Sequence, residues 1–466
     1  MKDTGLHHRG EQDEEEEELW PPAPTKIDSL PLTPSEYQRY GRQMILPGFG
    51  GLPAQLILKR SRVLVVGAGG LGCPAVQYLA LGGVGHITVV DHDVVERSNL
   101  ARQCLHTEKR IGMSKAESIR VAVEALNPHV TLAPITQQFT ASNALPLVSS
   151  HDLVLDCTDN PLTRYLINDA AVLCGKAVVS GAAQGLEGQL VVLHRELYDI
   201  NGAGSSGRGP CYRCLFPVAP RPQDVTDCSE GGVLGTITGL VGTLQANETI
   251  KLLLEGLHRS ADGNGEGSPS PPTPTMLLAS PMSVASSTLF RSIKLRPRRT
   301  DCRVCGDETA LTAKGLRRIS SLEEEDYISF CGLATLPPTG PGTEVEDYER
   351  RARTSVQDLT NLPRRPRLVV DVRTEEEWSI IRLPRGVNTI SECRATALRA
   401  KQRGSKQADK EELSLSLSTR HVPVLCKRGN DSKMAVAALE QLLRFVDITG
   451  GLTAWSKQVD PGFPMY

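Results

Sequence analysis

One glycine-rich turn near residue 70 constrains this chain more than any other feature. The apolar run 63–66 (Val-Leu-Val-Val) leads into Gly67, Gly69 and Gly72, which have the spacing Gly-x-Gly-x-x-Gly. Such a run is typical of a buried parallel strand, and the glycines allow a tight turn, close backbone approach to phosphate and close helix packing. The pattern predicts an α/β nucleotide-binding fold with phosphate at a helix N-terminus, where free N–H groups and the dipole favour anions.

A second strand and the polar residues behind it indicate which nucleotide binds. The run 86–91 (His-Ile-Thr-Val-Val-Asp) closes a βαβ unit and places Asp91 about 20 residues past the glycines, where an acid usually holds ribose hydroxyls. Several polar or cationic donors follow it: Asn99, Arg102, Gln103 and Lys115. These donors are more numerous than the pyrophosphate of a dinucleotide normally requires. We therefore predict that the chain binds a nucleoside triphosphate. The alternative for any one of them is a solvated surface charge.

Composition limits the class of protein. With 466 residues the chain is long enough for two or three domains. Its net charge of -2 argues against a general nucleic-acid-binding surface, and no run of about 18 apolar residues indicates a membrane span. The N-terminal segment lacks the apolar centre of a signal peptide, and twelve cysteines in this chain do not resemble a secreted disulfide scaffold. We expect a soluble protein of the cytosol, with no direct binding to membranes or nucleic acid.

The chain divides into four parts. Residues 1–34 are acidic and proline-rich and are expected to be disordered, because they cannot bury enough apolar surface to offset chain entropy. Residues 35–305 form the nucleotide-binding domain, with a flexible Gly-, Ser- and Pro-rich insertion at 259–275. Residues 306–353 indicate a mostly solvated linker whose short apolar pieces could dock on either domain. Residues 354–466 indicate a second, smaller α/β unit.

Polar residues also end another apolar strand, predicted within 151–160. Asp156, Asp159 and Asn160 lie at its carboxyl end, which faces the ligand crevice of an open α/β sheet. Hard oxygen ligands bridge a cation to phosphates, so these residues are candidates for binding Mg²⁺ or the adenine ribose. Alternatively, Asp159 caps the helix that begins near Pro161.

Two Cys-x-x-Cys pairs indicate a metal site. Cys211 and Cys214 form the first pair, and Cys302 and Cys305 form the second. Together they match a closed tetrahedral Zn²⁺ site with four thiolates, whereas either pair alone could equally be a redox pair or two free thiols. Four other cysteines fall in apolar or helical surroundings and are expected in the core: Cys73, Cys104, Cys157 and Cys174.

Two further cysteines are candidates for nucleophilic chemistry. Cys228 precedes an apolar helical segment, and a helix N-terminus lowers the pKa of a thiol. Cys426 ends the strand 422–426, in a loop with Lys427 and Arg428 that leads into a helix, a setting that favours a thiolate or persulfide. The alternatives are an unreactive loop cysteine at 228 and a structural cysteine at 426.

Together these residues resemble two known families. The motif Arg39-Tyr-Gly-Arg-Gln43, the glycine turn, Ser98 to Gln103, Lys115 and the cysteine pairs resemble the adenylating domain of ubiquitin-activating enzymes and their bacterial molybdopterin- and thiamine-pathway relatives. The segment 354–466, with Asp371-Val-Arg373, the Cys426 loop and Gly450 to Trp455, resembles a rhodanese sulfurtransferase domain. The fusion resembles the eukaryotic family of molybdenum cofactor synthesis adenylyltransferases and sulfurtransferases.

The resemblance implies a Rossmann-like adenylating domain with a structural zinc site, followed by an α/β rhodanese domain. It implies that Arg42 reaches the phosphates of a partner subunit in a homodimer, and that the four paired cysteines hold zinc. The implied substrates are small β-grasp proteins ending in Gly-Gly, namely the molybdopterin synthase small subunit and the ubiquitin-related modifier of tRNA thiolation. The residues implied to bind MgATP are Gly70, Asp91, Ser98, Asn99, Leu100, Ala101, Arg102, Lys115, Asp159 and Asn160.

The implied chemistry is adenylation of a carboxylate followed by sulfur transfer. Cys426 carries a persulfide that attacks the acyl-adenylate, and Cys228 attacks the acyl-disulfide or forms a thioester itself. Asn430, Asp431 and Ser432 replace the second cation that closes the loop of thiosulfate-using rhodaneses, so we expect a protein persulfide donor such as a cysteine desulfurase. Two other readings stay open: an activator that passes a Cys228 thioester to a conjugating partner, with a regulatory rhodanese domain, and a non-enzymatic scaffold.

Overall fold

A computed structural model of the chain describes most of the first two thirds and short stretches of the remainder. The described residues are 30–198, 205–220, 232–261, 273–282, 288–331, 353–355, 357–358, 369–373, 377, 380, 422–425 and 445–463. The chain separates into two units, residues 1–333 and 334–466. Of the helices in the described residues, none has the length and apolar character needed to cross a bilayer.

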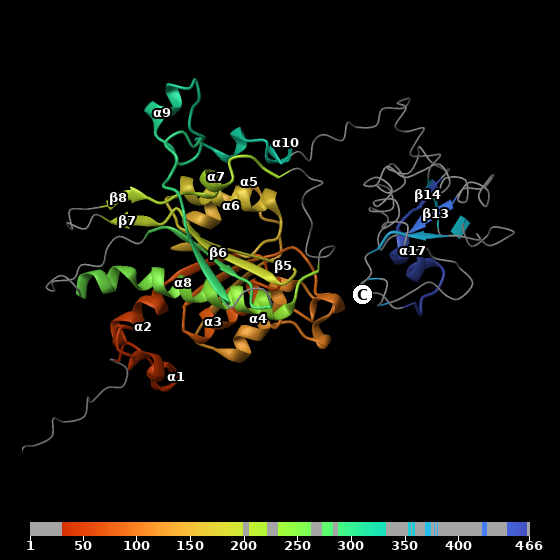
Figure 1. Cartoon of the computed structure of the whole chain (residues 1–466). Coiled ribbons are helices and arrows are strands. Elements are labelled where there is room, and N and C mark those ends of the chain that lie inside the picture. Colours follow the sequence, from red (N-terminus) through yellow and green to blue (C-terminus); the bar gives the residue numbers. More distant parts are fainter. Residues whose placement is uncertain are drawn as a thin grey trace, which may run out of the picture. The chain divides into compact units, whose positions relative to one another are not determined.

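The first unit is built on an eight-stranded sheet with the order β10-β9-β6-β5-β4-β1-β2-β3 (Figure 1). Neighbours from β5 to β3 are parallel, whereas β5, β6, β9 and β10 pair antiparallel. The strands are β1 (Arg62–Val66), β2 (His86–Val90), β3 (Thr131–Ile135), β4 (Leu153–Asp156), β5 (Val178–Gln184), β6 (Glu187–Leu193), β9 (Thr275–Ala279) and β10 (Phe290–Lys294). The chain order changes direction between β1 and β4, and such a switch point is where open α/β sheets bind ligands.

Helices cover both faces of this sheet (Figure 1). Val63 and Val65 of β1 pack with one helical layer, and Leu64 and Val66 pack with the other. A strand buried on both faces has no polar alternation, which explains the continuous apolar run in the sequence. One layer contains α2 (Gly51–Arg60), α3 (Gly72–Leu81), α4 (Lys115–Leu126) and α8 (Gly235–Ala261); the other contains α5 (Ala141–Ser149) and α6 (Pro161–Leu173). The predicted α/β class is confirmed.

Local signals in the sequence set several helix starts. Thr33 and Glu36 form a reciprocal capping box at the start of α1 (Pro34–Met44), which satisfies otherwise free N–H groups. Asn160 caps α6, and Pro161 follows at the first helical position, where its missing N–H costs nothing.

The segment 306–331, expected as part of a solvated linker, is folded onto the first unit. It contains α9 (Glu308–Thr312), the 3-10 turn η5 (Leu322–Glu324) and α10 (Tyr327–Phe330). Leu322 and Tyr327 are buried in the core that α5 and α6 share, and Leu311 is buried as well. The apolar pieces therefore dock on the nucleotide-binding domain. Part of the expected flexible insertion is regular too, because α8 extends to Ala261 and β9 begins at Thr275.

Smaller elements complete the two units. The first unit adds the hairpin β7 (Glu196–Tyr198) and β8 (Ser205–Arg208) and the short helix α7 (Tyr212–Leu215). In the second unit, a four-stranded sheet has the order β11-β14-β13-β12, and every neighbouring pair is parallel. Its elements are β11 (Arg353–Thr354), β12 (Val370–Asp371), β13 (Val422–Leu425), β14 (Phe445–Ile448) and α17 (Gly451–Gln458). Arg373 and Asp371 form a fully buried ion pair at 2.7 Å.

Candidate functional site

The glycine turn connects β1 to α3 and is packed too closely for any larger residue. Gly67 has a φ of 100°, and a Cβ there would lie 2.6 Å from the Cys157 carbonyl oxygen. A Cβ on Gly72 would lie 1.9 Å from the Gly67 carbonyl oxygen. The residue before α3, Leu71, offers no side-chain cap. In the first turn of α3 the Cys73 N–H donates to the Gly69 carbonyl at 3.0 Å and Pro74 has no N–H, which leaves the Gly72 N–H without an acceptor among the described residues. An uncapped helix start beside a glycine turn suits an anion.

Asp91 is joined directly to this turn. Its Oδ2 accepts a hydrogen bond from the Ala68 N–H at 2.7 Å, and its Oδ1 accepts one from the Asp93 N–H at 2.8 Å. Burial raises the pKa of Asp91 above its ordinary value. The carboxylate therefore shapes the turn, and its contact with a ribose stays a prediction.

Lys115 reaches the same edge of the sheet from the start of α4. Its Nζ donates to Asp93 Oδ2 at 2.7 Å, and its backbone N–H donates to the Asp93 carbonyl at 2.9 Å. Burial opposes ionisation of Asp93, but the hydrogen bond and charge of Lys115 outweigh it and lower the pKa of Asp93. A lysine charge is thus held near the glycine turn.

The segment 98–102 forms its own local hydrogen bonds. Asn99 is buried, and its Oδ1 accepts from the Glu96 N–H at 3.0 Å. Arg102 donates to the Ser98 carbonyl at 3.0 Å, while the Ser98 side chain donates to Glu96 at 3.2 Å. Leu100 is half-buried and Ala101 is exposed. These bonds fix the backbone of the segment.

Gln103 provides the clearest sign of a missing ligand. It is buried, and its Nε2 lies 3.7 Å from the place a Cβ would take on Gly69. Its Oε1 is buried without a hydrogen-bond partner in the described part of the chain. Buried polar atoms are almost always paired, so an unpaired one beside the turn fits a site that a polar ligand completes.

The first turn of α8 closes the other side of the site. A Cβ on Gly70 would lie 3.0 Å from three atoms of Thr238, and one on Gly235 would lie 2.4 Å from the Ala101 carbonyl oxygen. This contact was not predictable from the sequence, because Thr238 is far from the glycine turn along the chain. Gly70 is therefore held between its own loop and α8.

The polar residues after β4 have different roles from one another. Asp156 is buried and accepts from Ser180 Oγ at 2.6 Å and from Thr158 Oγ1 at 2.7 Å, so its oxygens are already engaged. Asn160, rather than Asp159, is the helix cap, since its Oδ1 accepts from the N–H groups of residues 162 and 163. Asp159 is exposed at the carboxyl end of the strand. Of the three, Asp159 is the one whose carboxylate makes no hydrogen bond within the described residues, so its binding of a cation stays a prediction.

Other predicted residues fall apart from this cluster or outside the described ranges. Arg42 is exposed on α1, and no interaction in the described part of the chain joins it to the glycine turn. Cys228 and Cys426 lie outside the described residues. Cys104 was expected in the core but is exposed, because the adjacent Leu105 and His106 take the inward positions of an irregular turn.

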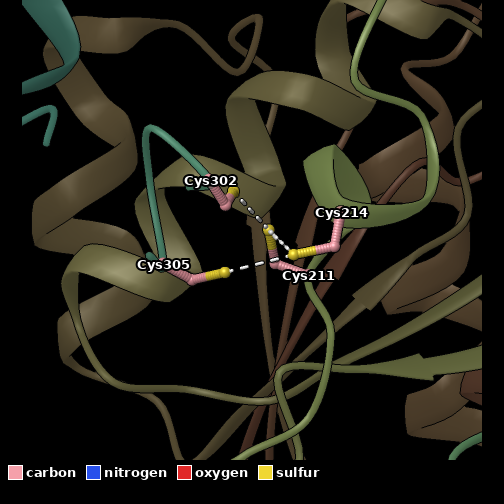
Figure 2. A group of neighbouring side chains, drawn as sticks. All are labelled: Cys211, Cys214, Cys302 and Cys305. Carbon is pink, nitrogen blue, oxygen red and sulfur yellow. Dashed lines mark hydrogen bonds between the residues drawn. The ribbon is translucent and has the colours of Figure 1, made fainter. Parts of the chain in front are cut away.

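The two cysteine pairs come together as one cluster (Figure 2). The sulfur of Cys211 lies 3.8 Å from Cys214 and 3.7 Å from Cys302, and Cys214 lies 3.4 Å from Cys305. All four sulfurs lie within 4.8 Å of one another. Four sulfurs around zinc with bonds of about 2.3 Å would be about 3.8 Å apart, so the donor set and spacing fit a Zn²⁺ ion.

Hydrogen bonds between the four thiols lower the pKa of Cys214 and Cys302 and raise the pKa of Cys211 and Cys305. Hydrogen bonds from Cys211, Cys214 and Cys305 lower the pKa of Cys302 far below its ordinary value. The Arg299 N–H also donates to the Cys214 sulfur at 3.4 Å. Thiolate is the form that binds a metal.

A buried ion pair anchors the first cysteine loop to α6. Arg213 donates to Asp169 Oδ2 at 2.7 Å, and both side chains are almost fully buried. Tyr327 also donates to Asp169, at 2.9 Å, and the Arg213 guanidinium lies 4.3 Å from the Phe330 ring centre. The first cysteine loop therefore contacts both α6, which Asn160 caps, and α10.

Comparison with known proteins identifies both parts of the chain. Residues 40–304 match the ThiF family, and residues 355–458 match the rhodanese-like domain. The adenylyltransferase and sulfurtransferase uba4 of Aspergillus fumigatus is 41% identical over 454 residues, which cover 94% of this chain and 88% of that protein. The chain belongs to the uba4/MOCS3 family.

Other members of the uba4/MOCS3 family are also similar to this chain over nearly its whole length. The adenylyltransferase and sulfurtransferase MOCS3 of Drosophila sechellia is 40% identical over 448 residues (93% of this chain, 86% of that protein). The Aedes aegypti protein of the same name is 41% identical over 447 residues (93% of this chain, 90% of that protein).

Among solved structures, E. coli MccB with MccA-N7isoASN is 20% identical with a TM-score of 0.45, over 59% of this chain and 77% of that chain. Both matched domains are enzymatic, so this chain is an adenylyltransferase and a sulfurtransferase.

Proposed function

We propose that this chain uses ATP to adenylate the C-terminal glycine of small ubiquitin-like sulfur carriers and then converts that carboxylate into a thiocarboxylate. The carriers are the molybdopterin synthase small subunit and the ubiquitin-related modifier. The enzyme would thereby serve molybdenum cofactor synthesis and the 2-thiolation of the wobble uridine in tRNA. It acts in the cytosol, with a cysteine desulfurase as the persulfide donor.

The observation that carries this proposal is the presence of both family matches on one chain, with relatives of about 40% identity across nearly all of it. An adenylating domain activates a carboxylate, and a rhodanese domain carries sulfur. Fusing the two joins activation of a carrier to delivery of sulfur. The uncapped start of α3 and the unpaired Gln103 oxygen support nucleotide binding at the glycine turn.

In the first step, an oxygen of the carrier's terminal carboxylate attacks the α-phosphorus of ATP, and pyrophosphate leaves. The Gly69 and Gly72 N–H groups and the Lys115 ammonium stabilise the negative charge that develops on the phosphate oxygens. Asp159 would hold a magnesium ion, which when bound would neutralise phosphate charge. Arg42 acts on the phosphates of a partner subunit, which makes the active form a homodimer.

In the second step, the terminal sulfur of a Cys426 persulfide attacks the acyl carbon, and AMP leaves. The product is an acyl-disulfide on Cys426. Attack by the Cys228 thiolate on the Cys426 sulfur then releases the thiocarboxylate and forms a Cys228–Cys426 disulfide, which a cellular thiol reduces. Zinc at the four-cysteine cluster is structural, because all four positions of a tetrahedral ion are filled by protein sulfur.

The test is intact-mass spectrometry of a small β-grasp protein ending in Gly-Gly, incubated with the full chain, MgATP and a persulfide donor. We expect one oxygen of the carrier to be replaced by sulfur. Cys426→Ala should abolish the sulfur gain but keep pyrophosphate exchange into ATP. Cys104→Ser, which changes an exposed cysteine outside both sites, should behave like the wild type.

Two outcomes would contradict the proposal. Exchange of pyrophosphate and a Cys228 thioester without any sulfur gain would favour an activator that supplies a conjugating partner. No exchange with any Gly-Gly carrier would favour a binding role without turnover.

A further inference from the structure

Ala68, between the first two glycines of the turn, has both of its polar backbone groups fixed by side chains. Its N–H donates to Asp91 Oδ2 at 2.7 Å, and its carbonyl oxygen lies 3.0 Å from His106 Nε2. The Cys73 sulfur lies 3.5 Å from the same carbonyl oxygen. The backbone of the turn is therefore held from two directions.

The partners of His106 define its protonation. A carbonyl oxygen only accepts hydrogen bonds, so Nε2 carries the proton that reaches Ala68. Nδ1 lies 2.8 Å from Ser118 Oγ and accepts from that hydroxyl in the neutral ring. Burial lowers the pKa of His106, which favours this neutral form. The Ala68 carbonyl thus selects the tautomer, and Ser118, one turn after Lys115 on α4, holds the other side of the ring.

The bond from His106 determines where the next N–H points. In a trans peptide, the carbonyl and the following N–H lie in one plane and point in opposite directions, and no described peptide bond is cis. With the Ala68 carbonyl turned toward His106, the Gly69 N–H is turned away from it. No atom in the described part of the chain accepts from this N–H.

We propose that His106 is a positioning residue for adenylation: it orients the Ala68 peptide so that the Gly69 N–H is presented to the phosphates of ATP. The inference rests on the proposed use of the glycine turn for ATP. Without the His106 bond the peptide is free to rotate, and the donor is no longer fixed before the nucleotide arrives.

A second buried histidine provides a matched control. His151, in the bend between α5 and β4, lies 2.7 Å from Thr88 Oγ1, 2.6 Å from the Leu147 carbonyl oxygen and 3.1 Å from Ser150 Oγ. None of these partners belongs to the glycine turn. Replacement of either histidine removes the hydrogen bonds of a buried ring, but only replacement of His106 changes the turn.

The experiment measures MgATP binding by calorimetry, together with the KM for ATP and the kcat in carrier-dependent pyrophosphate exchange, on the full chain. In His106→Leu we expect the Kd and KM for ATP to rise about tenfold, while the KM for the carrier stays within twofold of the wild type. His106→Gln, whose amide nitrogen can replace Nε2 as the donor, should restore ATP binding to within threefold. Ser118→Ala should raise the KM for ATP about threefold. His151→Leu should lower the melting temperature but leave the KM for ATP unchanged.

The possible results separate this inference from the proposed function. If the wild type binds ATP and His106→Leu binds it equally well, the positioning role is wrong and the adenylation proposal is untouched. If His151→Leu raises the KM for ATP as much as His106→Leu, the effect is general destabilisation and the role is again wrong. If His106→Leu does not fold, unchanged ATP binding in Ser118→Ala overturns the inference. If the wild type does not bind ATP, both proposals fail.

Discussion

Lys115 and Asp93 form an ion pair in which one partner is buried and the other faces solvent. The Nζ and Oδ2 atoms are 2.7 Å apart, and the lysine side chain is 10% exposed whereas the aspartate side chain is 54% exposed. The lysine is therefore held in place by packing, and the aspartate occupies the side that is open. A phosphate oxygen that approaches from solvent meets an ammonium group that is already oriented.

Lys115→Ala should remove this oriented charge from the adenylation site. We expect carrier-dependent pyrophosphate exchange to fall by about a hundredfold or more, which is the usual effect of losing one group that stabilises transition-state charge. Transfer of sulfur from a protein persulfide donor to Cys426, which needs only the rhodanese domain, should not change. Lys109→Ala alters an exposed lysine of the same region and should leave both rates near the wild type. Equal exchange rates in the two variants would show that Lys115 has no role.

The cysteine cluster should bind one zinc ion per chain, measured by elemental analysis. Cys302→Ser removes one of four ligands, so we expect loss of most of the zinc and a fall of several kcal/mol in the free energy of unfolding, since structural zinc supplies about 10 kcal/mol. Cys104→Ser is the control, because Cys104 is exposed and outside the cluster. Equal zinc content in the two variants would contradict the assignment.

Asp169→Asn should destabilise the first unit strongly, although the side chain keeps nearly the same shape. The change removes the carboxylate charge that lies 2.7 Å from the buried Arg213 guanidinium and leaves only Glu325, at 3.7 Å, as an anionic partner. Breaking a buried pair costs about 3–5 kcal/mol. Urea unfolding followed by circular dichroism measures the effect. Glu124→Gln removes one partner of an exposed pair on α4 and should cost less than about 0.5 kcal/mol. Similar midpoints for both variants would rule out a stabilising role for the buried pair.

His194 should make the fold sensitive to acid. Burial lowers its pKa to about 4, whereas a histidine in the unfolded chain titrates near its ordinary value of 6.5. Between these values the unfolded state binds more protons, so the stability present above pH 6.5 is lost as the pH falls, by about 2 kcal/mol at pH 5 from this residue.

His194→Asn tests this without removing the local hydrogen bond. The His194 backbone has a φ of 53°, which asparagine tolerates well, and its Nδ1 interacts with the Lys176 carbonyl at 3.1 Å, where an amide nitrogen can donate. We expect the variant to lose less stability than the wild type between pH 7.5 and pH 5, measured by urea unfolding. A parallel pH dependence in the two proteins would mean that His194 does not titrate on unfolding.

Features encoded in neighbouring residues were predictable from the sequence. The strand before the glycine turn is predicted at 63–66 and spans Arg62–Val66, and the helix predicted to begin near Pro161 begins at that residue. Apolar runs, glycine spacing and capping residues act over a few positions, so they are visible without a structure. The two cysteine pairs were readable for the same reason, since each pair has its own spacing.

Contacts between distant segments were not predictable. His106 lies 38 residues from Ala68, and Tyr327 lies 158 residues from Asp169. A buried histidine and a surface one look alike in sequence. The folded state of 306–331 depends on packing and polar contacts with α6 and the first cysteine loop. The order of the antiparallel strands is also decided by packing across long separations rather than by local pattern.

The separation of the two cysteine pairs also sets a time order for biosynthesis. Cys211 and Cys302 are 91 residues apart, and β6 pairs with β9 across a similar stretch of chain. At about 5–20 residues per second, a ribosome needs on the order of 5–20 s to produce the second pair after the first. During that interval only two of the four sulfurs of the cluster have been synthesised, and one edge of β6 is unpaired. The nascent domain is therefore open to thiol oxidation and edge-strand aggregation until the chain reaches Cys305.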